Sequence, residues 1–143
     1  MAKTSIHIQP AKGSSEEHNR REKPLSYVVP ELSHLNESFE VCSIAERLRE
    51  KKKAYEATTG QKMQKKATPI REGVIVISPG TTLEQLKEFG HKCKEKYGIE
   101  AIQIHIHRDE GHNENGLWKT NHHAHMVFDW TQANGKSVKL DRD

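Results

Sequence analysis

Histidines occupy alternate positions in two apolar, strand-like runs, and no other feature of the sequence constrains the fold as much. The runs cover residues 104–110 and 122–128. Successive side chains of a β-strand point to opposite faces of the sheet. His105 and His107 therefore share one face of the first strand with Gln103, and the other face is expected to carry Ile102, Ile104 and Ile106.

The second run repeats this pattern. His123 and His125 project together, and the opposite, core-facing row consists of Ala124, Met126, Phe128 and Trp130. If the two strands pair as an antiparallel hairpin, both histidine rows lie on the same side of the sheet. There His107, His123 and His125 can present three imidazoles to one divalent metal ion.

Histidine pairs on strands more often belong to a solvated polar face than to a metal site. Two such pairs on neighbouring strands, with the carboxylate of Glu110 just past the first, favour a metal site here. His112 lies in a polar loop that contains glycine, and His122 points away from His123. We expect solvent or a hydrogen bond for these two rings.

The length of 143 residues suits one domain with a modest core. The two cysteines, Cys42 and Cys93, lie on separate predicted elements, so nothing indicates a disulfide framework or a cysteine-ligated zinc site. The sequence has no apolar signal core and no apolar run of membrane-spanning length. These features predict a cytoplasmic protein with no membrane segment.

The net charge of +3 permits binding to a polyanion without requiring it. Basic residues are concentrated between residues 47 and 71, where a nucleic-acid backbone would release counterions on binding. The alternative is a solvated helix whose lysines alternate with Glu46, Glu50 and Glu56, and the charge pattern alone favours that alternative. The candidate DNA-binding residues are Arg20, Lys51, Lys52, Lys65 and Arg71.

The first half of the chain is expected to begin with a strand over residues 4–9. Residues 14–35 form a polar loop region with a short helical turn, in which binding and chemistry are expected to concentrate. Ser43 is expected to cap a helix with Glu46 at its third position, and this helix is expected to weaken near Gly60 and to resume through Lys66.

In the second half of the chain, the sequence predicts a central strand over residues 73–78 that is buried on both faces. Thr82 and Gln85 form a capping box for a helix that Gly98 ends. The histidine strands follow at 99–107 and 122–130, and a turn at 134–135 is expected to lead into a further strand over 136–140. The fold class is α+β, an antiparallel sheet flanked by helices.

Three separated motifs resemble those of the MobV (Pre/Mob) family of plasmid mobilization relaxases, enzymes that nick one DNA strand at a transfer origin. The family's metal motif, HxDE followed by HxH, matches His107-x-Asp109-Glu110 and His123-x-His125. Its HNxR motif matches His18-Asn19-Arg20-Arg21, and its SHLN motif matches Ser33-His34-Leu35-Asn36. The resemblance implies a relaxase-like (HUH-type) palm. It also implies that residues 1–143 are the catalytic domain, at the N-terminal end of a longer protein.

Two departures from the family pattern concern the metal motif. The family's spacing between HxDE and HxH is shorter, and a proline usually stands where this chain has His122. Residues 111–121 are therefore expected to form an enlarged hairpin loop. The metal face tolerates this insertion because strand pairing, and not loop length, sets its geometry.

The resemblance also implies roles for single residues. His18 corresponds to the nucleophile, Arg21 is expected to bind the scissile phosphate or to stabilise the transition state, and Glu110 is expected to orient the nucleophile or a ligand imidazole. Tyr27 is the competing nucleophile, because other relaxase families use a tyrosine; its simpler role is packing.

The resemblance further implies Mn²⁺ or Mg²⁺ as the cofactor, whereas three imidazoles alone would also suit Zn²⁺. The expected partners are single-stranded or cruciform origin DNA, together with relaxosome or coupling proteins reached through a C-terminal region. Two alternatives stay open. One is a zinc hydrolase with Glu110 as general base, and the other is a non-catalytic DNA-binding module whose structural metal site His105 or Glu110 would close.

Overall fold

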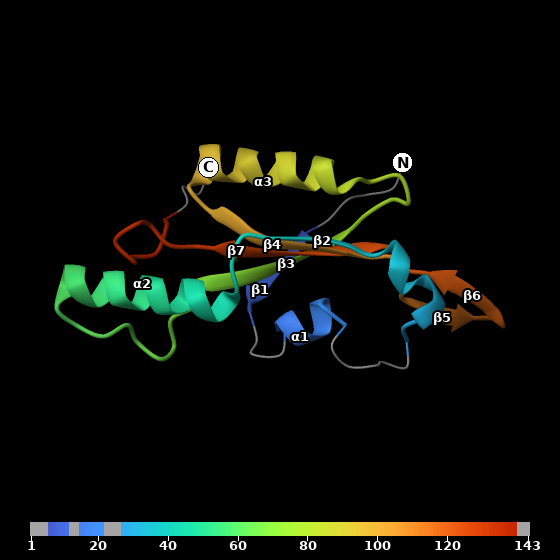
Figure 1. Cartoon of the computed structure of the whole chain (residues 1–143), viewed down its shortest axis with the longest axis horizontal. Coiled ribbons are helices and arrows are strands. Elements are labelled where there is room, and N and C mark those ends of the chain that lie inside the picture. The colour runs from blue at the N-terminus through green and yellow to red at the C-terminus, as the bar shows by residue number, and fades with distance from the viewer. Residues whose placement is uncertain (1–5, 12–14, 22–26, 140–143) are drawn as a thin grey trace.

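A five-stranded antiparallel sheet organises the molecule. The computed structural model describes residues 6–11, 15–21 and 27–139. The strands lie in the order β1 (Ile6–Pro10), β3 (Ile70–Val76), β7 (His123–Asp129), β4 (Glu100–His107) and β2 (Glu37–Glu40). Figure 1 shows α3 (Leu83–Tyr97) on one face of the sheet, with α1 (Ser15–Asn19) and α2 (Ile44–Thr59) on the other. The predicted α+β class is confirmed.

The main core lies between the sheet and α3. Ala124, Met126 and Phe128 of β7 pack there with Leu86 and Cys93 of the helix. Thr82 and Gln85 form the predicted capping box, and Gly98 ends α3 with a left-handed φ of 77°. Apolar side chains at every second strand position therefore meet the apolar stripe of one helix.

A second, smaller core lies under α2 and is built from Ile70, Ile102 and Val127, with Ile44 and Leu48 packed against it. Ser43 caps α2 by accepting a hydrogen bond from the Glu46 N–H. The predicted continuation to Lys66 is wrong. Gly60 adopts a left-handed φ of 74° and ends the helix, and within the described chain no helix follows before β3.

The structure corrects the predicted position of Ile102. The register between β4 and β7 shifts between Ala101 and Gln103, so β4 carries one extra residue at this point. The bulge turns Ile102 to the α2 face, whereas Ile104 and Ile106 stay in the main core as expected.

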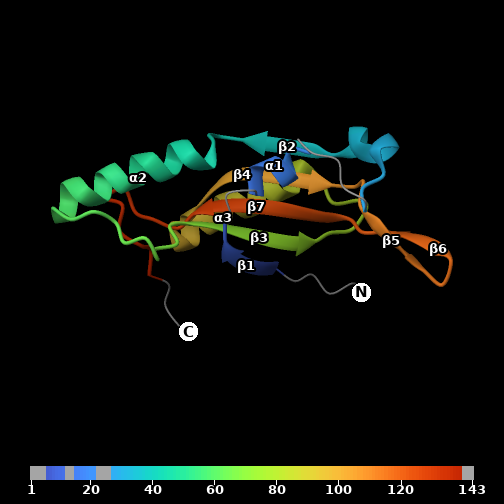
Figure 2. The ribbon, with the colours of Figure 1, turned by 90° about the horizontal axis from the view of Figure 1, so that it is seen from below.

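The predicted central strand is also corrected. β3 begins at Ile70, three residues earlier than expected, and lies between β1 and β7, so β7 is the centre of the sheet. Val76, at the far end of β3, is 52% exposed. Figure 2 shows the reason, because α2 covers only the end of the sheet where β3 begins.

Several segments are more ordered than the sequence indicates. Within the expected loop at 111–121, β5 (Gly111–Glu114) and β6 (Leu117–Thr120) form a separate hairpin. Its turn residues, Asn115 and Gly116, have φ values of 53° and 80°, as a type I′ turn requires. The region 14–35 contains α1 and a 3-10 helix, η1 (Pro30–Leu35), and β2 follows it.

The two ends of the chain agree with the predictions only in part. β1 covers Ile6–Pro10, and residues 4 and 5 of the predicted first strand lie outside the described residues. The turn at Gly135 forms, but a single bridge between Thr131 and Ser137 replaces the predicted last strand, and residue 140 is not among those described. None of the helices in the described ranges has both the length and the apolarity that crossing a bilayer requires.

Candidate active site

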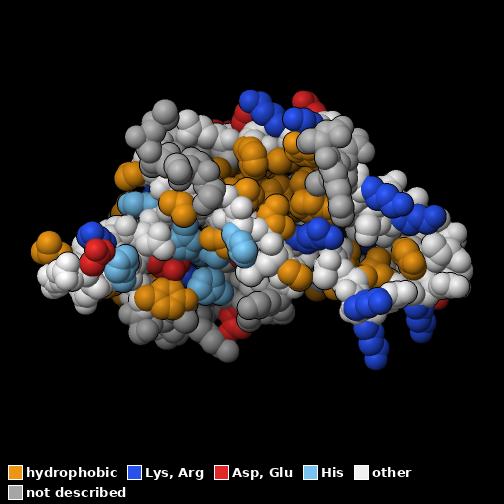
Figure 3. All heavy atoms as spheres, turned by 180° about the vertical axis from the view of Figure 1, so that it is seen from behind, with side chains coloured by type: hydrophobic (Ala, Val, Ile, Leu, Met, Phe, Trp, Pro, Cys, Tyr) orange, Lys and Arg blue, Asp and Glu red, His pale blue; other side chains and the backbone are white. Residues whose placement is uncertain are grey.

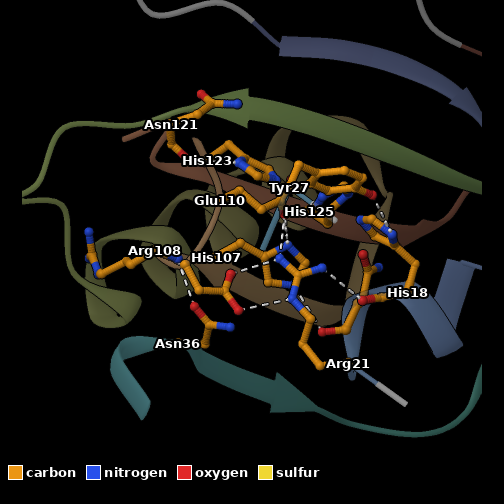
Figure 4. Close-up of polar contacts among 12 residues, drawn as sticks. His18, Arg21, Tyr27, Asn36, His107, Arg108, Glu110, Asn121, His123 and His125 are labelled. Carbon is orange, nitrogen blue, oxygen red and sulfur yellow. Dashed lines mark hydrogen bonds and ion pairs between the residues drawn. The ribbon is translucent and has the colours of Figure 1, made fainter. Parts of the chain in front are cut away.

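Strand pairing brings the three predicted imidazoles together on the face of the sheet that α1 covers. His107 lies directly opposite His123, and His125 lies opposite His105, the neighbour of His107 on the same face. The ring centroids are 5.3 Å apart for His107 and His123, and 4.9 Å apart for His125 and each of these two. Figure 4 shows these rings turned toward Glu110.

Each of the three rings uses one nitrogen to donate a hydrogen bond to an oxygen outside the cluster. The pairs are His107 Nε2 with the Asn19 carbonyl at 2.9 Å, His123 Nδ1 with the Asn121 carbonyl at 3.1 Å, and His125 Nδ1 with the Glu72 carboxylate. Because a carbonyl or carboxylate oxygen only accepts, each bond fixes the tautomer. The second nitrogen of each ring therefore keeps its lone pair.

The second nitrogens of His107 and His125 face one another, whereas that of His123 faces Glu110 and lies outside the group of mutually close ligand atoms. Nδ1 of His107 and Nε2 of His125 are buried, and neither has a hydrogen-bond partner in the described structure. Ligand atoms of His18, His107, Glu110 and His125 all lie within 4.8 Å of one another. Buried lone pairs without partners are costly, and imidazoles held by second-shell oxygens are typical of metal ligands. The residues present fit a divalent cation.

Glu110 lies among these rings. Its Oε2 is 3.2 Å from Nδ1 of His107 and 3.1 Å from Nε2 of His123, and it forms an ion pair with Arg21. Burial raises the pKa of this carboxyl, but the contacts with His107, His123 and Arg21 outweigh that effect and hold the pKa well below its usual range. Glu110 is therefore a fixed negative charge beside the rings.

His105 points to the same face but joins a different network. Its Nε2 is 3.1 Å from Oε1 of Gln103, and burial lowers its pKa to about 4. A role for His105 as a fourth ligand therefore gains no support from its contacts. His112 is exposed, as predicted.

The three sequence motifs meet at Asp109, a fully buried carboxylate. Nε and Nη2 of Arg21 donate to its two oxygens at 3.1 and 2.8 Å, and the hydroxyl of Ser33 donates to Oδ2 at 2.7 Å. Asn36 accepts a hydrogen bond from the Arg108 N–H at 2.7 Å. The HNxR and SHLN segments are thus bound to the turn that carries Glu110.

His18 lies at the edge of the cluster, with its ring centroid 5.8 Å from that of His107 and 5.5 Å from that of His125. Burial, the charge of Arg21 and the proximity of His125 lower the pKa of His18. The imidazole is therefore neutral at neutral pH. Arg21 also donates from Nη1 to the His18 carbonyl at 3.2 Å, which holds this segment in place.

Tyr27, the competing nucleophile, is 40% exposed, and its hydroxyl is 3.4 Å from Nδ1 of His18. Burial of the phenol and the negative charge of Glu110 raise the pKa of Tyr27, so the hydroxyl keeps its proton. The structure therefore brings both candidates to one site, and the ring of His18 is the one that contacts His107 and His125.

The candidate DNA-binding residues do not share one surface. Arg20 is bound bidentately to Glu40 at 2.8 and 2.7 Å, and Arg71 stacks over Trp130 in the main core. The Lys51 ammonium donates to the Gln132 carbonyl at 3.0 Å, and its side chain is only 12% exposed. Lys52 and Lys65 are exposed. DNA contact by these residues stays a prediction.

Glu72 is the main site residue that the sequence analysis missed. It is buried on β3 and accepts the hydrogen bond from His125. A carboxylate directly before the predicted strand at 73–78 was the available signal, because charged side chains are seldom buried without a partner. Figure 3 shows the resulting surface, where histidine side chains gather on one face with acidic atoms among them.

No protein-family model matches the sequence, and a search of curated proteins finds no relative. Solved structures do match. A Mn-bound MobM relaxase domain (MOBV; Mob_Pre) in complex with plasmid pMV158 oriT DNA (22nt) at pH 5.5 superposes with a TM-score of 0.69 and 21% identity, covering 99% of this chain and 78% of that one. The chain has the fold of the MobM relaxase domain.

Two further MobM structures agree with this result. The Mn-bound complex at pH 4.6 gives a TM-score of 0.67 at 22% identity, and the complex with 3′-thiophosphate DNA at pH 6.8 gives 0.67 at 21%. Both cover 99% of this chain and 78% of the MobM chain. The predicted relaxase-like palm is therefore confirmed as a fold.

Proposed function

We propose that this domain cuts one strand of DNA at a transfer origin through a covalent intermediate on His18. The observation that carries the proposal is a neutral imidazole at the edge of a cluster whose buried nitrogen lone pairs face one another. The likeness to MobM relaxase domains solved with oriT DNA and manganese supports the same assignment.

His107, His123 and His125 would hold the divalent ion, and the manganese in the MobM structures favours Mn²⁺ over Zn²⁺. When bound, such an ion polarises a phosphate group and offsets the charge that develops during phosphoryl transfer. Glu72 and the carbonyls of Asn19 and Asn121 set the orientation of the rings.

The neutral imidazole of His18 attacks the phosphorus, and the bond from phosphorus to the 3′ oxygen breaks. The 5′ phosphate stays on the ring nitrogen. The proton that the ring loses from its other nitrogen balances the proton that the 3′ oxygen gains. The reverse reaction rejoins the strand and frees the imidazole.

The contacts of Arg21 support a positioning role beside the phosphate contact that the motif suggests. Its guanidinium is bound to Asp109, Glu110 and the His18 carbonyl. We assign it mainly to positioning His18 over the cluster, with its positive charge held close to the reacting phosphate.

A second function is supported by one observation. His18, His107, Glu110 and His125 form a group of four ligand atoms, as many as a closed structural zinc site contains. In that case His18 would be a ligand, and the domain would bind DNA without cutting it. A zinc hydrolase that uses only water would likewise leave no covalent adduct.

The test is covalent capture of DNA. The protein is incubated with Mn²⁺ and a pool of single-stranded oligonucleotides of random sequence, labelled at either the 3′ or the 5′ end. Only the 3′ label should stay with the protein on a denaturing gel, since the 5′ phosphate becomes attached to it. Mass spectrometry should place the adduct on His18.

The matched variants are His18→Ala and Tyr27→Phe. The first should abolish the adduct and keep Mn²⁺ affinity, and the second should retain both. An adduct that survives in His18→Ala and vanishes in Tyr27→Phe would transfer the chemistry to the tyrosine. A loss of metal affinity in His18→Ala would instead identify a fourth ligand and support the structural site.

A further inference from the structure

The β5–β6 hairpin projects from the end of the sheet beside the candidate site, as Figures 1 and 2 show. Both of its ends are attached to site residues. The Gly111 N–H donates to the Tyr27 carbonyl at 3.2 Å, and the Asn121 N–H donates to the Glu110 carbonyl at 2.8 Å. A DNA strand that enters or leaves the cluster at this edge must pass the hairpin.

The hairpin carries large apolar side chains in solvent. Trp118 is 43% exposed and Leu117 is 69% exposed, and neither belongs to a hydrophobic core. The other tryptophan, Trp130, is 7% exposed and lies in the main core. Trp118 is therefore an ordered aromatic side chain whose exposed ring adds little to the stability of the fold.

The indole packs against the backbone of Gly111. A Cβ at position 111 would lie 2.7 and 2.8 Å from Cε2 and Cζ2 of Trp118, and 2.5 Å from the Lys119 carbonyl. Only a glycine lets the ring lie flat against the backbone here. Gly111 follows Glu110 directly in the sequence, so the indole packs on the residue next to a carboxylate of the candidate site.

A flat, partly exposed aromatic ring next to a phosphodiester site matches the surface of a nucleobase. Stacking of bases on aromatic side chains is the usual way in which proteins bind single-stranded nucleic acid, and it tolerates any base. The next residue, Lys119, is paired with the Glu114 carboxylate at 3.1 Å, so the proposed contact rests on the indole.

We propose that Trp118 is a stacking platform for an unpaired base of the DNA strand next to the scissile phosphate. This inference rests on the proposed function, because it assumes that DNA occupies the site. It goes beyond that function by assigning a base contact to the hairpin inserted between the two parts of the metal motif.

The experiment uses the emission of the two tryptophans. The 143-residue chain with Mn²⁺ is titrated with fluorescein-labelled oligodeoxythymidylate of roughly 20 nucleotides, longer than the usual site of one single-strand-binding module. Anisotropy of the label reports binding, and a separate titration with unlabelled DNA reports tryptophan quenching. Stacking on Trp118 should quench its emission, whereas Trp130 is shielded in the core.

Three variants separate the contributions. Trp118→Ala should weaken binding by roughly tenfold, the usual order for loss of one base–aromatic stack. Trp118→Phe should keep most of the affinity and lose the quenching, because phenylalanine can stack but lacks the indole emission. Leu117→Ala changes a neighbour that is even more exposed and should alter neither quantity. Mn²⁺ affinity and circular dichroism should be equal in all three.

Three results would overturn the platform. If the wild type binds the oligonucleotide without quenching, or if Trp118→Ala binds as tightly as the wild type, the platform is wrong and the proposed function stands. If the wild type shows no change in anisotropy at low salt, DNA binding fails and the platform fails with it. Quenching by a protein partner in the absence of DNA would identify the hairpin as a protein contact.

Discussion

At the scale of single residues, Glu72 sets the orientation of the His125 imidazole. It accepts the hydrogen bond from Nδ1 of His125 and so turns Nε2 toward the cluster. We predict that Glu72→Ala lowers Mn²⁺ affinity by about 10- to 100-fold, the usual effect of losing such a partner.

Isothermal titration of Mn²⁺ into the variant checks this prediction for Glu72. Glu72→Gln keeps an acceptor and should lose less affinity than the alanine variant. Glu84→Ala removes a carboxylate from the exposed side of α3 and serves as the control. Equal affinity in wild type and Glu72→Ala would contradict the proposed ring orientation.

The buried ring of His105 makes the free energy of unfolding depend on pH. Burial lowers its pKa from 6.5 to about 4, so the unfolded chain takes up this proton first as the pH falls. The folded state therefore loses stability between about pH 6.5 and 4, at up to about 1.4 kcal/mol per pH unit for this one group. His18, His122 and His125 act in the same direction, because burial lowers the pKa of each.

Urea unfolding of the metal-free protein at a series of pH values measures this effect. The difference between wild type and His105→Gln isolates the single group, and the variant should show a shallower slope between pH 6.5 and 4. His112→Gln alters an exposed ring and should leave the slope unchanged. A wild-type slope in His105→Gln would disprove the assignment.

At the scale of secondary-structure elements, α2 has one side that faces the protein and one side that faces solvent. Arg47 and Lys51 point inward, where Arg47 binds Glu100 at 2.6 Å and both approach the buried Asp129. Lys52 and Lys53 are exposed. We predict that only the exposed pair contributes to DNA binding.

Salt titrations of DNA affinity separate the two sides. The double variant Lys52→Glu and Lys53→Glu should reduce the log–log salt slope by about 1 to 2, since each phosphate contact contributes about 0.7 to 0.9. Lys51→Ala should keep the slope and lower the free energy of unfolding by about 1 to 2 kcal/mol, because Asp129 loses a charged partner. An unchanged slope in the double variant would show that the exposed side of α2 is a solvated surface without DNA contacts.

The elements also show how far the sequence predicts the fold. α3 was predictable because its capping box and its terminal glycine are local signals. β2 was not, because its four residues form a strand only through pairing with the edge of β4. The bulge at Ile102 has the same origin, since strand alternation alone cannot reveal an extra residue that the partner strand accommodates.

The same reasoning applies to the candidate site. Alternation placed His107, His123 and His125 on one face, because that face follows from strand geometry alone. The contacts of Glu72 and Asp109 join segments far apart in the chain, and only the folded structure reveals them. Sequence therefore predicted which rings meet, and the structure shows what orients them.

At the scale of the whole molecule, metal binding and folding should be linked. The free imidazole nitrogens that face one another come together only in the folded sheet. Mn²⁺ at about 100 times its dissociation constant should therefore add about 2.7 kcal/mol to the free energy of unfolding. Thermal unfolding with and without Mn²⁺ measures this gain.

A chelator should reverse the stabilisation by Mn²⁺. The triple variant with alanine at His107, His123 and His125 should unfold at one temperature regardless of the ion. Calcium prefers oxygen ligands and should stabilise the wild type far less. Equal stabilisation of the triple variant would show that the ion binds elsewhere.

The short helix α1 has a consequence for dynamics. Its sequence, Ser15–Asn19, contains no apolar side chain, and polar bonds from Glu16, Asn19 and Arg21 attach this segment to the sheet. Segments held without hydrophobic burial open more readily than the core. Amide hydrogens from 15 to 21 should therefore exchange well before those of β7, so that His18 can move away from His107 and His125 while the sheet stays folded.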